Sequence, residues 1–166
     1  MIETRPIRVG EAKAFRELWL KGLAQQPDAF LLTLEEGECI TEAQVADGGS
    51  KRTHWGAFED GQLLALAVIR RGWCARLRHT ADIGPLYTDP NHQRRGLART
   101  LMGALIAEAG TLGLLQLELT VEANNHAARA LYDGLGFVEF GLRPRSVIID
   151  GEPRDDALML LRLDDS

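Results

Sequence analysis

The sequence has few cysteines, and they form no recognisable redox or metal-binding pattern. Cys39 and Cys74 are the only two among 166 residues, and they are not spaced as a Cys-x-x-Cys motif. No ligand spacing with these cysteines or with each other is seen for the four histidines, which are His54, His79, His92 and His126. We therefore expect no metal site, and two thiols that take no part in chemistry in a reducing compartment.

Long hydrophobic runs and an excess of positive charge are also absent. The longest purely apolar run, Leu63 to Ile69, is far shorter than the about 20 residues that a membrane-spanning helix needs. Residues 1–6 lack the basic and apolar segments of a secretory signal. The 24 acidic against 19 basic residues give a net charge of −5, which disfavours a general nucleic-acid or anionic-membrane binder. We predict a cytoplasmic protein that binds neither nucleic acid nor membrane.

The composition is that of a globular protein with a core. Hydrophobic residues make up 45% of the chain and charged residues 26%. A chain of this length buries about 68 to 70% of its unfolded surface without needing a disulfide or a metal. No internal repeat, low-complexity tract or shift in composition divides it, so we predict a single domain over residues 1–166.

Helix signals dominate the first 50 residues. Apolar residues at helical spacing predict an amphipathic helix over about residues 10–25, which Pro27 closes. Thr33-Leu34-Glu35-Glu36 has the form of a capping box and predicts a second helix, weakened by Gly37 and Ile40. The pair Gly48-Gly49 predicts a loop.

Strands and helices then follow one another in a mixed order. Runs at 54–59 and 63–71 predict a hairpin around Asp60-Gly61-Gln62. A third strand at about 80–88 contains Gly84-Pro85, and proline cannot donate to a ladder, so we expect a bulge there. A long helix from Leu97 to about Gly110 or Gly113 precedes a strand with one polar face over 115–122.

The end of the chain predicts one more helix and two strands. Asn124-Asn125 supplies N-cap candidates for a helix through Leu135, which Gly136 ends. Strands at 137–149 and 157–163 are joined around Asp150-Gly151. The whole order predicts a mixed α/β domain.

The loop between the strand at 80–88 and the long helix predicts an anion site. A helix N-terminus presents unpaired N–H groups and the positive end of a dipole, and Gly96 allows close approach. Arg94, Arg95 and Arg99 add positive charge, which indicates a phosphate or diphosphate ligand rather than a merely solvated turn. The loop has neither a P-loop nor a GxGxxG pattern, so ATP and NAD are disfavoured.

Two ordered motifs resemble those of GNAT-type N-acetyltransferases. Gln93-x-x-Gly96-x-Ala98 is similar to that family's Q/R-x-x-G-x-G/A signature. Residues 125–137 match its N-x-x-A-x-x-L-Y-x-x-x-G-F segment, after the strand that the family has there. The resemblance implies a single GNAT-fold domain with a mixed, mostly antiparallel sheet of six or seven strands and about four helices. It also implies that the family's fourth strand, here 80–88, is bulged and splays from the fifth.

The resemblance implies acetyl-CoA as co-substrate and direct transfer of its acetyl group to a primary amine of a small molecule or peptide. Backbone amides of the loop would hold the diphosphate, Leu86 and Thr88 would pair with pantetheine, and Asn125 would bind that arm or simply cap its helix. The implied cofactor-binding residues are Leu86, Tyr87, Thr88, Gln93, Arg94, Arg95, Gly96, Leu97, Ala98, Arg99, Asn125 and Tyr132.

Three residues receive catalytic roles from the resemblance. The amide of Leu86 would stabilise the oxyanion. Tyr132 would protonate or anchor the leaving sulfur. The alternative role for Tyr132 is that of an aromatic residue in the core. Asp82 matches the position of the histone-acetylating branch's base and would remove a proton from the amine, directly or through water. Alternatively, Asp82 only forms hydrogen bonds at the end of its strand. Glu118 and Glu122 are the other candidates for the base.

Other activities stay open at this point. A non-catalytic CoA-binding module and an enzyme that uses a longer acyl-CoA would share the same motifs. The acceptor would be selected by residues 25–34, which include Asp28 and Phe30, and by residues 143–154. The sequence leaves the acceptor itself undetermined, and it leaves open whether the chain forms a homodimer.

Overall fold

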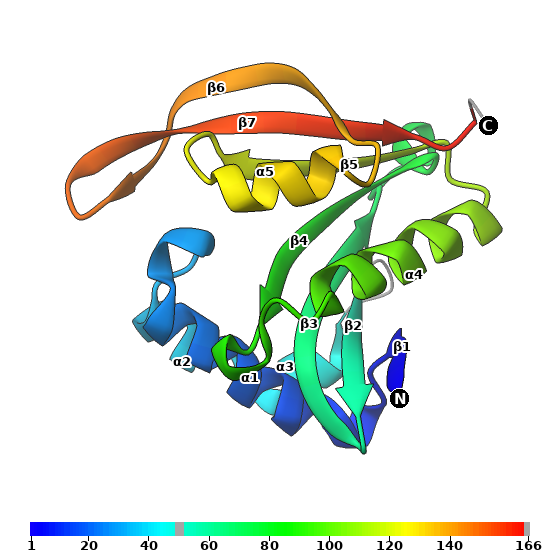
Figure 1. Ribbon diagram of the computed structural model, residues 1–166, viewed down its shortest axis with the longest axis vertical. Coiled ribbons are helices and arrows are strands. Elements are labelled where there is room, and N and C mark those ends of the chain that lie inside the picture. The colour runs from blue at the N-terminus through cyan, green and yellow to red at the C-terminus, as the bar shows by residue number, and fades with distance from the viewer. Residues whose placement is uncertain (49–51, 165–166) are drawn as a thin grey trace. The chain divides into compact units, whose positions relative to one another are not determined.

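The computed structural model describes residues 1–48 and 52–164, so Gly49 of the predicted loop lies outside the described residues. The strands are β1 (Ile2–Pro6), β2 (Arg52–Glu59), β3 (Gln62–Arg71), β4 (Thr80–Thr88), β5 (Gln116–Glu122), β6 (Val138–Ile149) and β7 (Glu152–Arg162). The α-helices are α1 (Ala12–Gln25), α2 (Leu34–Glu38), α3 (Glu42–Asp47), α4 (Leu97–Thr111) and α5 (His126–Asp133). Figure 1 traces them along the chain. The mixed α/β class is confirmed.

The seven strands follow the order β1-β2-β3-β4-β5-β7-β6 in one mixed sheet. The chain forms two compact units, and each is described by itself. The first unit contains Met1–Arg70 and Pro85–Leu105, and the second contains Arg71–Gly84 and Ile106–Ser166. The prediction of one domain over the whole chain stays a prediction.

In the first unit, β1, β2 and β3 form antiparallel pairs. Asp60 and Gly61, with φ of 50° and 80°, make the tight turn between β2 and β3. Two positive φ values are what a two-residue hairpin turn requires, so the Asp-Gly pair explains the predicted hairpin. β1 was not predicted, because its five residues have no clear alternation of their own and are ordered by pairing with β2.

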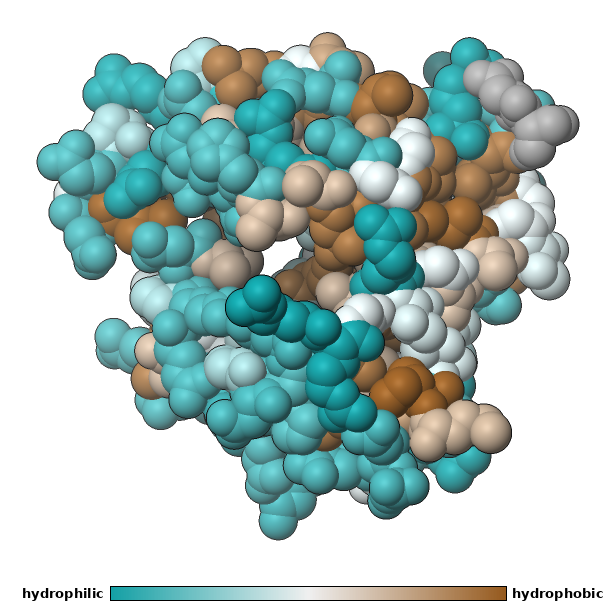
Figure 2. All heavy atoms as spheres, viewed as in Figure 1, coloured by the Kyte–Doolittle hydropathy of each residue, from teal (hydrophilic) through white to brown (hydrophobic). Residues whose placement is uncertain are grey.

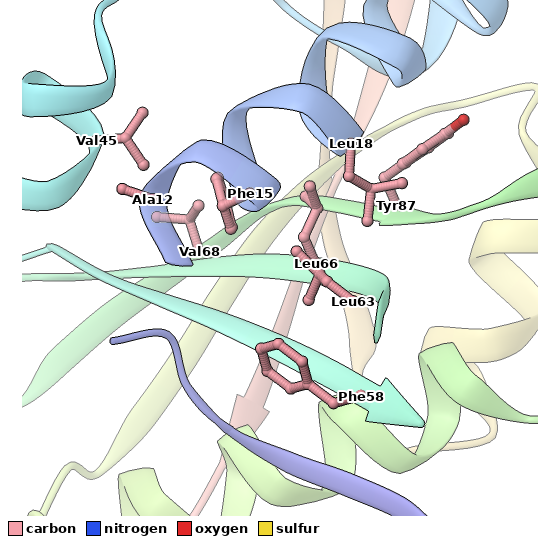
Figure 3. Packing of buried hydrophobic residues seen from close by; sticks show 9 residues of the cluster. All are labelled: Ala12, Phe15, Leu18, Val45, Phe58, Leu63, Leu66, Val68 and Tyr87. Atoms are coloured by element: carbon pink, nitrogen blue, oxygen red, sulfur yellow. The ribbon is translucent and has the colours of Figure 1, made fainter. Parts of the chain in front are cut away.

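Helix α1 covers the apolar core of the first unit. Its buried residues Phe15 and Leu18 lie over Leu66 and Val68 of β3, and Tyr87 of β4 joins the same cluster (Figure 3). Figure 1 shows α2 and α3 beside α1. Burial of this apolar stripe orders the predicted helix.

The second predicted helix is two short ones. Thr33 caps α2 and exchanges hydrogen bonds with Glu36, as the capping box predicted. The chain leaves the helix at Cys39, and α3 begins with a second capping box formed by Thr41 and Gln44. This Thr-x-x-Gln signal explains why two helices form where one was predicted.

In the second unit, β7 pairs antiparallel with both β5 and β6. Asp150 and Gly151, with φ of 51° and 80°, close the β6–β7 hairpin. β7 begins at Glu152 rather than at the predicted Ala157, because pairing with β6 extends it through a polar segment that contains Pro153. The core includes Leu117, Leu119 and Val121 on one face of β5, so the predicted alternation is confirmed.

The parallel pairing of β4 with β5 ends where the bulge was predicted. Thr80–Ile83 pair with Gln116–Leu119, and the next residue, Gly84, has a φ of 157°. Pro85 follows and has no N–H to donate. The Gly-Pro pair therefore ends the regular pairing while β4 continues to Thr88.

The exposed surface is mainly hydrophilic, with separate hydrophobic patches on the face shown in Figure 2. Exposed apolar side chains include Leu31, Trp73, Val138, Phe140 and Ile148. No helix in the described part of the chain is long and apolar enough to span a membrane.

The imidazole of His54 makes the stability of the first unit depend on pH. Burial, with a contribution from Arg52, lowers the pKa of His54 from 6.5 to about 4. The unfolded chain therefore binds the proton more readily between pH 6.5 and 4, and the free energy of unfolding falls as the pH falls through this window. We expect a loss of about 1 to 2 kcal/mol, allowing for the partial exposure of the ring.

The measurement is urea denaturation of the wild type and of His54→Gln at intervals from pH 7.5 to 4.5. The variant should lose less stability below pH 6.5 and run parallel to the wild type above it. Equal slopes below pH 6.5 would contradict the assignment.

Candidate active site

The loop between β4 and α4 presents main-chain donors at the start of a helix. Gly96 accepts the first helical hydrogen bond, from the amide of Thr100 at 2.9 Å. The amides of Leu97 and Ala98 come before this first donor, so they have no acceptor within the helix. Residues 93–96 are exposed, and the first turn of α4 contains no acidic residue. These are the donors that the predicted anion site requires, and the site itself stays a prediction.

Two residues of the loop adopt a left-handed backbone. Arg94 has a φ of 62° and Gly96 a φ of 77°. Nothing lies within 4 Å of the position that a Cβ on Gly96 would take, so this glycine is required by its backbone angle and not by crowding. Left-handed residues turn successive N–H groups toward one side, which suits an anion.

The arginines of the loop do not all act alike. Arg95 donates two hydrogen bonds to the carboxylate of Glu59, at 2.7 and 2.8 Å. The hydrogen bond from Arg95 lowers the pKa of Glu59, which stays ionised at neutral pH. The Arg95 guanidinium thus ties the loop to the end of β2, while Arg94 and Arg99 are exposed.

Residues 86–88 of β4 point to alternate faces of the strand. Tyr87 is buried in the core, with its ring 5.6 Å from that of Phe30 and its hydroxyl 3.5 Å from Oε1 of Gln25. Leu86 and Thr88 are half-buried. The side chain of Tyr87 is therefore taken up by the core, and a cofactor would contact this residue through its main chain. Phe30, weighed as a substrate-wall residue, belongs to the core, whereas its neighbour Leu31 is 82% exposed.

The remaining predicted site residues lie in the second unit. Asn125 caps α5, since its Oδ1 accepts a hydrogen bond from the amide of Ala128 at 3.1 Å. The capping role is therefore present, and it takes up the side-chain oxygen that was weighed for the pantetheine arm.

Tyr132 is buried within α5 and packs edge-on against Phe137, with ring centroids 6.0 Å apart. Burial raises the pKa of its hydroxyl to about 12. Among the described residues, none forms a hydrogen bond with this hydroxyl. The ring thus packs in the core while its hydroxyl keeps its proton, so the catalytic role of Tyr132 and its alternative both stay predictions.

The two main candidates for the base are neighbours in the second unit. Asp82 of β4 lies opposite Glu118 of β5 in the parallel register, so both side chains leave the same face of the sheet. Glu118 also accepts a hydrogen bond from Gln116 at 2.8 Å. The third candidate, Glu122, faces Arg154 at 3.5 Å. The structure thus brings together two carboxylates that the sequence could only name as rivals.

One polar pair beside the loop was not predicted. Asp89, the residue that follows β4, accepts a hydrogen bond from Nζ of Lys21 in α1 at 2.6 Å. The partners are 68 residues apart in the chain, so no local pattern pairs them. Asp89-Pro90 was visible as a turn signal.

Neither a metal site nor a disulfide emerges from the part of the chain that the structure describes. It contains no group of three histidine, cysteine or acidic side chains that could hold a metal ion. Cys39 is exposed and Cys74 half-buried, and both are free thiols.

Comparison with known proteins identifies the class. Residues 17–137 match the model of the acetyltransferase (GNAT) family. An Escherichia coli K12 protein named ribosomal protein bS18-alanine N-acetyltransferase is 32% identical over 116 residues, which cover 70% of this chain and 74% of that protein. The chain therefore belongs to the GNAT family, as the two motifs indicated, and is an N-acetyltransferase.

Solved structures share the fold. A GNAT-family acetyltransferase from Streptococcus pneumoniae superposes with a TM-score of 0.87 at 23% identity, covering 98% of this chain and all of that one. A Salmonella typhimurium protein described as a putative acetyltransferase with its cofactor acetyl-CoA has a TM-score of 0.78 at 22% identity, covering 99% and 95%. The predicted GNAT fold is confirmed.

Asn125 should contribute to stability through its cap. Asn125→Ala removes the acceptor for the amide of Ala128 and should cost about 1 kcal/mol. Asn125→Asp keeps an acceptor oxygen and should retain most of that stability. Urea denaturation of both variants measures this, and equal stability of Asn125→Ala and the wild type would show that the cap contributes nothing.

Proposed function

We propose that this chain transfers an acetyl group from acetyl-CoA directly to a primary amine of a small molecule or peptide, in a ternary complex. The observation that carries the proposal is the group of unpaired amides at the start of α4, beside exposed Arg94 and Arg99. A diphosphate carries the charge and the acceptor oxygens that such amides bind. The acetyl-CoA named with the Salmonella structure supports the choice of donor.

Direct transfer needs no covalent acyl-enzyme. The two cysteines lie outside the motif segments, and no Ser-His-Asp order is recognisable in the sequence. The amine therefore attacks the thioester carbonyl itself. The carbonyl oxygen becomes an oxyanion, the C–S bond breaks, and the CoA thiolate leaves.

The amide of Leu86 is proposed as the oxyanion donor. The regular ladder between β4 and β5 ends at Ile83 and Leu119, and Pro85 has no N–H. Leu86 is the first residue after the Gly84-Pro85 pair, and it lies in the part of β4 beyond the regular pairing with β5. A fixed donor aimed at the developing charge stabilises the transition state.

Tyr132 is proposed to anchor the departing sulfur. A hydroxyl with a pKa of about 12 holds its proton at neutral pH, whereas a free thiol has a pKa of about 8.5. Burial disfavours the tyrosinate that full proton transfer to the thiolate would leave behind. Of the two roles weighed for Tyr132, a hydrogen bond to the sulfur is therefore favoured over general acid catalysis.

Removal of the amine proton is assigned to the carboxylate pair of Asp82 and Glu118. An alkyl ammonium must lose a proton before its nitrogen can attack, and water can relay that proton to a carboxylate. Asp82 is the primary candidate, with Glu118 beside it in the register. A cationic acceptor also suits this acidic sheet face.

A peptide with an N-terminal alanine is included among the proposed acceptors because the E. coli relative is named for an alanine of ribosomal protein bS18. Acetyl-CoA is incubated with the chain and a panel of amino acids, small amines and peptides with a free N-terminal alanine, and thiol release and product mass are recorded. Turnover of at least one amine supports the proposal. CoA binding without turnover of any acceptor would instead indicate a non-catalytic CoA-binding module. Turnover only with longer acyl donors would indicate an enzyme that uses another acyl-CoA.

Gly96→Glu tests the diphosphate site. The variant places bulk and negative charge beside the free amides and should weaken CoA binding by more than about tenfold in calorimetry. Gly96→Ala introduces the same left-handed strain without the charge and should lose less. Gly103→Glu adds the same charge at an open, exposed position of α4 and serves as the control. Wild-type affinity in Gly96→Glu would refute the site.

Tyr132→Phe tests the sulfur-anchoring role. The variant should lower kcat by about tenfold while the affinity for acetyl-CoA stays near that of the wild type, because the hydrogen bond forms only as the thiolate develops. The high pKa of Tyr132 also predicts that the wild type shows no loss of kcat from tyrosine ionisation up to pH 10. An unchanged kcat in the variant would discard the role.

A further inference from the structure

Lys21 and Asp89 form a partly buried ion pair next to the diphosphate loop. The Asp89 side chain is buried, and its Oδ2 lies 2.6 Å from Nζ of Lys21. Lys21 belongs to α1, near the segment expected to contact the acceptor. Asp89 stands between the end of β4 and the turn Pro90–His92. The pair therefore links two segments of the first unit at the entrance to the loop.

Asp89 sets the direction in which the chain leaves β4. Its amide donates to the carbonyl of Leu64 at 2.9 Å. Its Oδ1 accepts from the amide of Asn91 at 3.0 Å, and its carbonyl accepts from the amide of His92 at 2.8 Å. Four groups of one residue are thus engaged, counting the contact with Lys21. The turn that these bonds define leads directly into Gln93 and the loop.

This arrangement places a negative charge close in sequence to an anion site. Burial alone would raise the pKa of Asp89, but the hydrogen bonds from Lys21 and Asn91 outweigh it and lower the pKa, so the carboxylate is ionised. Nδ1 of His92 lies 3.9 Å from Oδ1 of Asp89, which is beyond hydrogen-bond distance. Lys21 is the one side chain among the described residues that donates a hydrogen bond to Asp89.

We propose that Lys21 and Asp89 are a positioning pair for the donor diphosphate: Asp89 holds the loop in its binding conformation, and Lys21 cancels the charge that this requires. The inference rests on the proposed function. Without Lys21, the Asp89 carboxylate would repel a diphosphate held by the loop. A buried carboxylate without a partner is also unfavourable, so the turn would rearrange to expose it to water. The pair does not contact the reacting atoms.

Neutralising the two charges one after the other separates this role from simple packing. Lys21→Met leaves Asp89 uncompensated and should raise the Kd for CoA by about tenfold or more in calorimetry. Adding Asp89→Asn to Lys21→Met removes the charge, keeps an oxygen that accepts from Asn91, and should restore the Kd to within about threefold of the wild type. Lys13→Met is the matched control, because Lys13 lies on the same helix in an exposed pair with Glu17.

A donor without a diphosphate supplies the second measurement. With acetylpantetheine, Lys21→Met should retain the wild-type kcat/KM, whereas with acetyl-CoA it should lose about tenfold or more, mainly through KM. Thermal unfolding of each variant shows that the native fold is retained.

Each outcome is decisive. Equal losses with both donors, wild-type CoA affinity in Lys21→Met, or no recovery in the double variant would each overturn the positioning pair while the proposed function stands. Absence of CoA binding in the wild type would instead overturn the proposed function, and the pair with it.

Discussion

A helix cannot satisfy its own first N–H groups, and this constraint organises the first unit around the start of α4. Donors without acceptors are unfavourable unless water or a ligand takes them. Here Gly96 caps the helix with its carbonyl only, and Arg94 and Gly96 adopt left-handed conformations that present the amides together. The negative charge of Glu59 is compensated by an ion pair with Arg95 of the loop. These features are the basis for proposing an external anion at the loop.

The end of β4 also leaves main-chain groups outside a regular hydrogen-bond pattern. Gly84 and Pro85 stop the pairing with β5 without ending the strand, so the following residues keep an extended backbone with a donor at Leu86. In the proposed mechanism this donor serves the oxyanion, and the amides of α4 serve the diphosphate. Main-chain groups released by two local features of the sequence therefore account for most of the proposed donor recognition.

Local sequence signals explain why many of the helices, strands and turns could be predicted. Asp60-Gly61, Thr33-x-x-Glu36, Gly84-Pro85 and the stripe of α1 each specify geometry through neighbouring residues. β1 and the first half of β7 could not be predicted, because polar or proline-containing segments become strands only by pairing with distant partners. The same holds for the contact of Lys21 with Asp89 and for the adjacency of Asp82 and Glu118, which depend on tertiary pairing. The residues proposed to bind the diphosphate are contiguous in one loop, so a local pattern could suggest them. The groups proposed for acid–base chemistry meet only through tertiary pairing, which a local pattern does not reveal.

Tyr87 connects the strand proposed to bind the donor to the segment proposed to select the acceptor through one packing contact. Leu86 and Thr88, proposed for the CoA arm, flank a ring that packs on Phe30 from the segment expected to select the amine. Gly22 makes this contact feasible, because a Cβ there would come within 2.6 Å of the Phe30 ring. Changes at position 30 would therefore disturb β4, the strand proposed to bind the thioester arm. In the proposed site, acceptor preference is therefore expected to respond to substitutions at solvent-facing neighbours such as Leu31, because these leave the packing of Phe30 on Tyr87 intact.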